Sequence, residues 1–357
     1  MQRFKPYTLN LGGRLTMVDK PLVMAILNTT PDSFFSGSRC PQKEAISQRV
    51  RQMVEEGADI IDIGGYSSRP NADDVPADEE YRRVEEGLRI VREVAPQIPV
   101  SVDTFRASVA ERCVGEWGVE IINDIAAGGL DPDMIATVGR VKAAYIMMHM
   151  RGNPHTMTSL CDYDDVVADI LQYFCRKINE AQQAGICDII LDPGFGFSKT
   201  LDQNYELLSR MDAFLETGLP LLVGVSRKSM IYKLFGTTPD EALNGTTAIN
   251  TIALMQGVAV LQSGKIRTNS IVSMNDKTET GFLEEYIRNY KEDFDEECDK
   301  YLFADKEFIT SFTTRIDDLD MWRLYGDNAR GVCMVFERIN KDCDELYKIS
   351  YIDEKSD

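Results

Sequence analysis

The sequence is poor in several features that mark particular classes of protein. Only two of its 357 residues are histidines, His149 and His155, which excludes a histidine-rich metal site. Its eight cysteines form no Cys-x-x-Cys pair and are too sparse for a disulfide scaffold, so reduced thiols are expected. The longest apolar runs are strand-sized, and the N-terminal segment contains no apolar signal core. We therefore expect a cytoplasmic protein without a membrane span.

Positive charge is also scarce. The chain has 39 Lys and Arg residues against 58 Asp and Glu residues, a formal net charge of −19. Phosphate backbones and anionic lipid surfaces repel such a chain, so neither nucleic acid nor a membrane is an expected partner. Hydrophobic and charged contents of 43% and 27% are those of an ordinary globular protein.

Acidic residues are distributed unevenly along the chain. Residues 273–357 carry 23 acidic and 12 basic residues, whereas residues 1–272 carry 35 and 27. This shift, in a chain more than twice the usual domain length of about 150 residues, predicts a domain boundary. We expect one domain over residues 1–265 and a small, acidic α+β appendage over residues 266–357.

Short apolar runs, many rich in β-branched residues, alternate with amphipathic stretches in the first part of the chain. Several runs are apolar on both faces, as strands of a parallel sheet covered on both sides must be. Eight β–α units within about 260 residues fit a (β/α)8 TIM barrel better than an open sheet. The predicted strands span residues 21–28, 58–65, 99–104, 121–125, 143–149, 188–194, 220–226 and 258–261. A hairpin turning at Gly12-Gly13 is expected to close the barrel bottom.

Nearly every predicted strand ends in polar residues, and TIM-barrel enzymes place their chemistry at these C-terminal ends. Asp103, Asn123 and Asp192 offer the acceptors and the amide that suit a planar, hydrogen-bond-rich heterocycle. Arg69 and Lys228 suit an anionic group. Asn28 beside Asp32 suits a hard cation bound through oxygen. The pattern predicts a ligand with a ring and an anion, with magnesium on a phosphate.

Some of the polar residues have a structural alternative. We interpret Asp62 and Asp124 as caps or packing residues, because a single aspartate at a strand end more often caps a helix than catalyses. His149 follows an apolar run, which favours a buried structural histidine over a functional one. Arg227 is a candidate for an ion pair on the outside of the barrel.

Seven segments within residues 1–261 resemble the dihydropteroate synthases, the sulfonamide-sensitive enzymes of folate synthesis. They are LNTTPDSFF (27–35), GGYSSRP (64–70), SVDT (101–104), IINDI (121–125), MMHMRGNP (147–154), LDPGFGF (191–197) and VSRKSM (225–230), in the family's order and spacing. Related pterin-binding methyltransferases share the barrel but lack the TPDSF and SRKS segments. The resemblance implies a pterin-binding TIM barrel.

The resemblance also implies a reaction, in which p-aminobenzoate condenses with 6-hydroxymethyl-7,8-dihydropterin diphosphate to give dihydropteroate and pyrophosphate. Mg²⁺ is the implied cofactor, small molecules are the implied substrates, and sulfonamides are the implied inhibitors. Members of the family are usually homodimers, so a homodimer is expected here.

The resemblance assigns roles to individual residues of this chain. The implied catalytic residues are Asp103, Asp192, Lys228 and Arg69. The implied pterin contacts are Asp103, Asn123, Ile125, Met148, Asp192 and Lys228. The implied p-aminobenzoate and loop residues are Thr30, Asp32, Phe34, Ser68, Arg69, Pro70, Phe197 and Ser229. The implied phosphate contacts are Asn28, Ser68, Arg69 and Arg267, with Asn28 also the metal ligand.

The sequence departs from the family at the eighth strand, which normally ends in an Arg-x-His that grips the pyrophosphate. Gln262 and Gly264 stand at these two positions. Losing a charge-assisted contact costs about 1.5–3 kcal/mol, so a catalytically impaired fusion that still binds pterin or sulfonamide is the alternative hypothesis. Residues 262–357 resemble an uncharacterised bacterial family instead, through a motif over residues 273–279 and another over residues 311–336.

Overall fold

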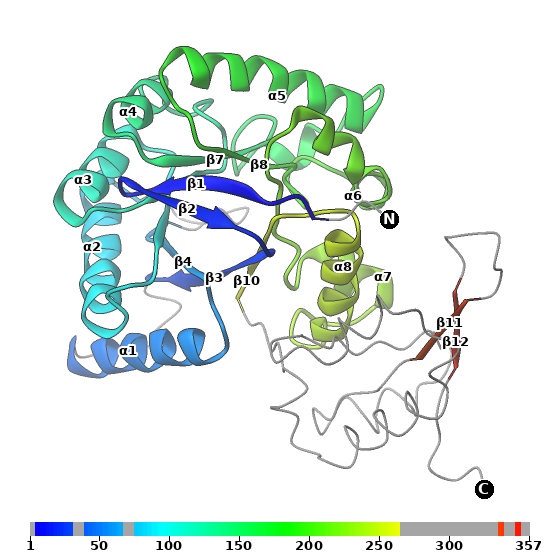
Figure 1. Ribbon diagram of the computed structural model, residues 1–357, viewed down its shortest axis with the longest axis horizontal. Helices are drawn as coiled ribbons and strands as arrows, with labels where there is room; N and C mark the ends of the chain where they lie inside the picture. The colour runs from blue at the N-terminus through cyan, green and yellow to red at the C-terminus, as the bar shows by residue number, and fades with distance from the viewer. Residues whose placement is uncertain (1–3, 31–38, 67–74, 265–334, 339–346, 351–357) are drawn as a thin grey trace, which may run out of the picture. The chain divides into compact units, whose positions relative to one another are not determined.

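The computed structural model describes residues 4–30, 39–66, 75–264, 335–338 and 347–350 (Figure 1). The chain divides into two compact units, Gln2–Ile266 and Arg267–Asp357 with Met1. The described residues of the second unit are an antiparallel pair, β11 (Val335–Arg338) and β12 (Tyr347–Ser350). The polar strand ends predicted from the sequence all lie in the first unit.

The first unit contains an eight-stranded parallel sheet with the order β8-β7-β6-β5-β4-β3-β10-β9. Leu191 of β8 forms a parallel bridge with Leu221, directly before β9, so the two edges of the sheet meet. The strands are β3 (Leu22–Asn28), β4 (Ile60–Gly64), β5 (Val100–Asp103), β6 (Ile121–Asp124), β7 (Ala144–Met148), β8 (Ile189–Asp192), β9 (Leu222–Val223) and β10 (Val260–Ser263). This closure confirms the predicted TIM barrel.

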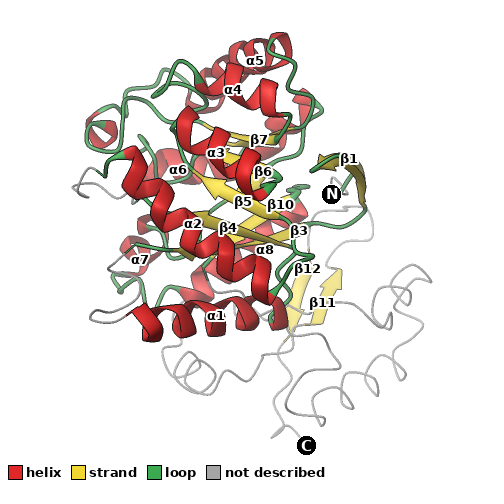
Figure 2. Cartoon of the chain, turned by 90° about the vertical axis from the view of Figure 1, so that its left-hand side faces the viewer, coloured by secondary structure: helices red, strands yellow, loops and turns green. Residues whose placement is uncertain are grey.

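Helices surround the strands, as the side view in Figure 2 shows for α1, α2 and α3. Their bounds are α1 (Arg39–Glu55), α2 (Ala77–Val94), α3 (Ala107–Trp117), α4 (Met134–Val141), α5 (Val166–Gln183), α6 (Leu201–Ser209), α7 (Ser229–Phe235) and α8 (Leu243–Met255). In α2 the buried residues Tyr81, Val84, Leu88 and Val91 recur at helical spacing, so one face packs on the barrel. Short 3-10 helices span Met157–Ser159 and Met211–Thr217.

The hairpin β1 (Tyr7–Leu11) and β2 (Arg14–Val18) lies across the barrel in Figure 1. Gly12 and Gly13 have φ angles of 60° and 85°, which explains the two glycines at this turn. Leu9, Leu11 and Val18 are buried against residues inside the barrel such as Met24 and Ile190. The hairpin therefore closes one end of the barrel, as predicted.

Side chains of each strand alternate between the inside of the barrel and the surrounding helices. On β4, Ile60 packs inside the barrel, whereas Ile61 and Ile63 belong to the core beneath the helices. The alternation places Asp62 inside, where it is 1% exposed. Apolar residues thus fill the end of the barrel closed by the hairpin, and polar residues occupy the other end.

Candidate active site

Four residues lie at one level across adjacent strands at the polar end of the barrel. Asn28 pairs in register with Gly64, Gly64 with Asp103, and Asp103 with Asn123. Gly64 has no side chain, and a Cβ built there would lie 3.4 Å from Asn28 Oδ1 and 3.7 Å from Asp103 Oδ2. The glycine therefore lets an amide oxygen and a carboxylate oxygen face the same space.

Inside the barrel, Asp62 joins the predicted pterin residue Asn123 to the eighth strand of the barrel. Asn123 Nδ2 donates to Asp62 Oδ2 at 3.1 Å, and Gln262 Nε2 donates to the same oxygen at 2.7 Å. In these two bonds Asp62 caps neither a helix nor a turn, and its burial inside the barrel agrees with the other half of the prediction, a packing residue. Asp124 does cap a turn, since its carboxylate accepts from the N–H groups of Ala126 and Gly128.

The carboxylates at this end of the barrel share a poorly solvated environment. Burial raises the pKa of Asp62, and burial together with the negative charge of Asp62 raises the pKa of Asp103. Burial likewise raises the pKa of Asp192, although the nearby positive charge of Lys228 opposes this shift. A cationic guest would therefore offset the desolvation of all three carboxylates, and at Asp103 it would also offset the repulsion from Asp62.

Asp192 ends β8, and Lys228, which follows β9, contacts the loop after β8. Asp192 Oδ1 accepts from the N–H of Gly194 at 2.8 Å, while Lys228 Nζ donates to the carbonyl of Phe195 at 2.6 Å. Lys228 Nζ also lies 4.6 Å from the centroid of the Phe197 ring, within cation–π distance. Burial lowers the pKa of Lys228 to about 8.

A second lysine, Lys199, is buried and binds the backbone of the loop after β8, a role that was not predicted from the sequence. Lys199 Nζ donates to the carbonyls of Gly194 and Phe197, both at 2.9 Å, and lies 3.2 Å from His149 Nδ1. Burial and the charge of Lys199 lower the pKa of His149 to about 2, so the ring is neutral. His149 is thus a buried structural histidine, as the sequence favoured. The sequence shows a lysine at position 199, but it does not show that the side chain points toward His149.

The apolar residues predicted to line the ring site lie together. Ile125 and Met148 are buried in one cluster with Ala126, Met150 and Met157, and Phe197 packs against that cluster. Gly194 makes this close approach of the loop to β7 feasible, because it has a φ of 74° and a Cβ there would lie 2.2 Å from the His149 carbonyl oxygen. The cluster forms an apolar wall beside Asp192.

Two further predicted loop residues are described. Thr30 is half-buried and follows Thr29, whose N–H donates to the Gly64 carbonyl at 2.9 Å. Ser229 is half-buried and begins α7, directly after Lys228. The other predicted residues lie outside the described part of the chain: Asp32, Phe34, Ser68, Arg69, Pro70 and Arg267. Arg227 forms the predicted ion pair, with Asp240 at 2.8 Å.

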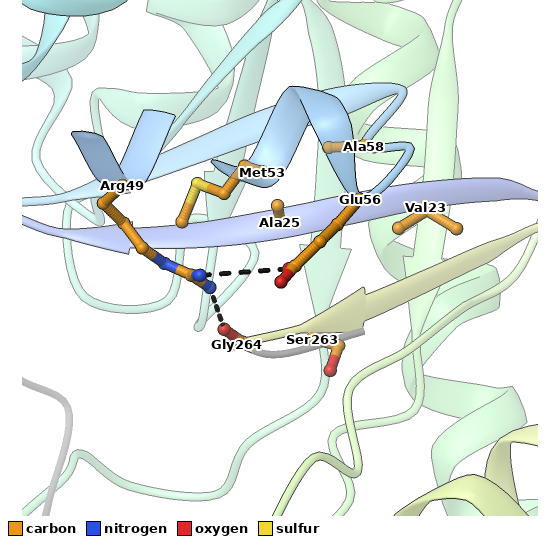
Figure 3. Close-up of a pocket in the computed structure, with 8 residues that line it drawn as sticks. All are labelled: Val23, Ala25, Arg49, Met53, Glu56, Ala58, Ser263 and Gly264. Carbon is orange, nitrogen blue, oxygen red and sulfur yellow. Dashed lines mark hydrogen bonds and ion pairs between the residues drawn. The ribbon is translucent and has the colours of Figure 1, made fainter. Parts of the chain in front are cut away.

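A small hollow lies between α1, β3 and the C-terminal end of β10 (Figure 3). It is lined by Val23, Ala25, Arg49, Met53, Glu56, Ala58, Ser263 and Gly264. Arg49 donates to the carbonyl of Gly264 across it. None of the predicted site residues lines this hollow.

Among the described residues, no group of three or more His, Cys, Asp and Glu side chains is placed to hold a metal ion by itself. The oxygen atoms of Asn28 and Asp103 that face the space over Gly64 are hard donors. Mg²⁺ in phosphate-binding sites takes few protein ligands and completes its shell with substrate oxygens and water. The residues present therefore fit a magnesium ion bound together with a diphosphate.

The sequence profile described as "Pterin binding enzyme" matches residues 24–262, from within β3 to within β10. The closed barrel and the carboxylate-rich strand ends agree with this match. Fold and site therefore define a pterin-binding enzyme. None of the described helices is long and apolar enough to cross a membrane.

Known relatives narrow the class. The dihydropteroate synthase of Escherichia coli is 42% identical over 246 residues, covering 68% of this chain and 86% of that protein. The enzyme of Synechocystis sp. is 40% identical over 243 residues, covering 67% and 83%. The structure of the Xanthomonas albilineans synthase with 4-aminobenzoic acid matches with a TM-score of 0.67, 34% identity, and coverage of 80% and 99%. The chain belongs to the dihydropteroate synthases, which are transferases of folate synthesis.

Proposed function

We propose that this chain condenses p-aminobenzoate with 6-hydroxymethyl-7,8-dihydropterin diphosphate, giving dihydropteroate and pyrophosphate. The observation that carries the proposal is the row of Asn28, Gly64, Asp103 and Asn123 at one level of the barrel, with Asp192 and Lys228 nearby. A structure of the Xanthomonas albilineans synthase with 7,8-dihydropteroate is also similar, with a TM-score of 0.64 and 32% identity. This relationship favours catalysis over the alternative of pterin binding without turnover.

The ring of the pterin would lie between Asp103, Asn123 and Asp192, against the apolar wall of Ile125 and Met148. When the bond between the methylene carbon and the diphosphate oxygen breaks, its electron pair leaves with the diphosphate and positive charge develops on the ring. The Asp103 carboxylate, which the negative charge of Asp62 repels, would stabilise such a charge without reorganising. Lys228, near Asp192, would orient the ring.

The amine nitrogen of p-aminobenzoate then forms the new bond to the methylene carbon and gives up one proton. We propose that Phe197, whose ring lies 4.6 Å from Lys228 Nζ, and Ser229, which follows Lys228 in the chain, line the p-aminobenzoate pocket. Thr30, Asp32, Phe34, Ser68, Arg69 and Pro70 are proposed to close over the reactants. Their closure would exclude water, which otherwise competes for the cationic carbon. A similar structure, from Yersinia pestis, is of a complex with a sulfonamide drug, so we propose sulfonamides as inhibitors here.

Asn28 is the proposed magnesium ligand, with the diphosphate oxygens supplying further ligands, and Arg69 and Ser68 are the proposed phosphate contacts. A bound magnesium ion would stabilise negative charge on the departing diphosphate. Gln262 at the end of the barrel donates to Asp62 and offers no positive charge to a phosphate. Arg267 is the proposed replacement contact.

The domain assignment remains a proposal, with residues 1–265 as the synthase and residues 266–357 as an acidic segment that resembles an uncharacterised bacterial family. A homodimer is also proposed from the family.

The test of the function is formation of dihydropteroate, detected by mass, from the full chain with both substrates and magnesium. Product from the unmodified chain and from Glu111→Gln, an exposed surface carboxylate, but not from Asp192→Asn is expected. Equal product from Asp192→Asn would contradict the assignment.

A further inference from the structure

Asp62 connects two other strands of the barrel through hydrogen bonds inside it. It lies on β4. Asn123 is on β6 and Gln262 is on β10, so one strand of the sheet separates β4 from each of these two strands. A side chain that reaches both must extend across the barrel interior. Its 1% exposure agrees with that position.

The two contacts to Asp62 determine how Asn123 presents its amide. Asn123 and Gln262 both bring an amide nitrogen to the same oxygen, Asp62 Oδ2. Because Oδ2 accepts both hydrogen bonds, it holds the nitrogen of each amide toward itself. The oxygen of the Asn123 amide is then turned away from Asp62, where it can accept from a ring N–H.

The end of the Gln262 side chain lies beside the backbone that follows β9. Gly224 follows β9, and a Cβ on that residue would lie 2.7 Å from Gln262 Oε1. The absence of a side chain at Gly224 therefore leaves the space that the end of the Gln262 side chain occupies. Burial raises the pKa of Asp62, and the hydrogen bonds from Asn123 and Gln262 oppose this shift.

We propose that Asp62 is a positioning residue for pterin recognition, which fixes the Asn123 amide with its oxygen toward the ring, and that Gln262 fixes Asp62. This inference rests on the proposed binding of a pterin by Asn123. It assigns Asp62 and Gln262 no contact with the reacting atoms. It also gives Gln262 a defined role inside the barrel, as the anchor of a buried carboxylate.

The experiment measures binding of 6-hydroxymethyl-7,8-dihydropterin, the ring without its diphosphate, by calorimetry on the full chain. Phosphate contacts then do not enter. Asp62→Asn is expected to weaken ring binding about tenfold, and Gln262→Met about threefold, because each removes part of the restraint on the amide. The KM for p-aminobenzoate is expected to stay unchanged, which a general loss of structure would not allow. Glu111→Gln, which removes an exposed carboxylate, is the matched control.

A double-mutant cycle decides whether Asp62 acts through Asn123. In the Asn123→Ala background, Asp62→Asn is expected to lose most of its effect on ring binding, leaving only the effect of its charge on Asp103. Independent, additive losses would overturn the inference, as would unchanged binding in Asp62→Asn. If Asp62→Asn does not fold, wild-type affinity in Gln262→Met overturns it instead. A chain that binds the ring but forms no product contradicts the proposed reaction and leaves this inference standing, whereas failure of the unmodified chain to bind the ring overturns both.

Discussion

Lys199 Nζ lies 3.2 Å from His149 Nδ1, and the same ammonium group donates to two carbonyls of the loop that follows Asp192. A buried lysine thus holds a loop of the active site against a neutral histidine. Burial lowers the pKa of Lys199 to about 7, so the lysine changes its charge within an accessible pH range.

This pair predicts a pH dependence of stability. The pKa of Lys199 is lower in the folded chain, about 7, than its ordinary value of 10.5. Between these two values the unfolded chain binds more protons, so the contribution of Lys199 to the free energy of unfolding rises as the pH rises from about 7 to 10.5. Below pH 7 the folded chain carries the full cost of the buried charge. His149, with a pKa of about 2, adds no change in this range.

The measurement is the free energy of unfolding of the full chain and of Lys199→Met between pH 6 and 10. We expect the difference, wild type minus variant, to increase with pH above about 7. Lys142→Met serves as the control, because Lys142 lies at the C-terminus of α4, outside this site. A difference that is independent of pH would contradict a titrating, buried Lys199.

We expect a substitution at Gly64 to lower activity with little effect on stability. A Cβ at this position would meet Asn28 Oδ1 at 3.4 Å and Asp103 Oδ2 at 3.7 Å, and both are ordinary contact distances. Gly64→Ala is therefore expected to change stability by less than about 1 kcal/mol, yet to lower product formation at least about tenfold by occupying the space between the two oxygens.

The matched control is Gly115→Ala in α3, where a Cβ meets nothing within 4 Å. Alanine favours a helix over glycine, so this variant is expected to be more stable by about 0.5–1 kcal/mol with unchanged activity. Thermal unfolding and initial rates check both variants. Full activity in Gly64→Ala would show that the space over this glycine is not used by the substrates.

Sequence patterns predicted the barrel and the level of its site because strand ends of a barrel must converge, whatever the loops do. They placed Asn28, Asp103, Asn123 and Asp192 correctly at these ends. They could not show that Asp62 reaches Asn123 and Gln262, because alternation along a strand tells which way a side chain points and not what it meets. The turn of Lys199 toward His149 depends on loop geometry that no local pattern encodes.

We expect that a positive charge at position 262 would strengthen the binding of pyrophosphate. The Gln262 amide donates to Asp62 and carries no charge, whereas the resemblance places an arginine at this position. We expect Gln262→Arg to tighten pyrophosphate binding about tenfold to a hundredfold, in proportion to about 1.5–3 kcal/mol for a charge-assisted contact. Calorimetric titration with pyrophosphate and magnesium measures the change. Unchanged pyrophosphate affinity would show that another group, such as Arg267, already supplies the contact.

The central claim is that the carboxylates at the strand ends support a p-aminobenzoate-dependent release of pyrophosphate. The most direct measurement is pyrophosphate release by the full chain, given the pterin diphosphate and magnesium, with and without p-aminobenzoate. The account predicts release that requires p-aminobenzoate and falls at least about a hundredfold in Asp103→Asn, since this carboxylate stabilises the developing positive charge. Absence of release from the folded, unmodified chain, or equal release from Asp103→Asn, would contradict it.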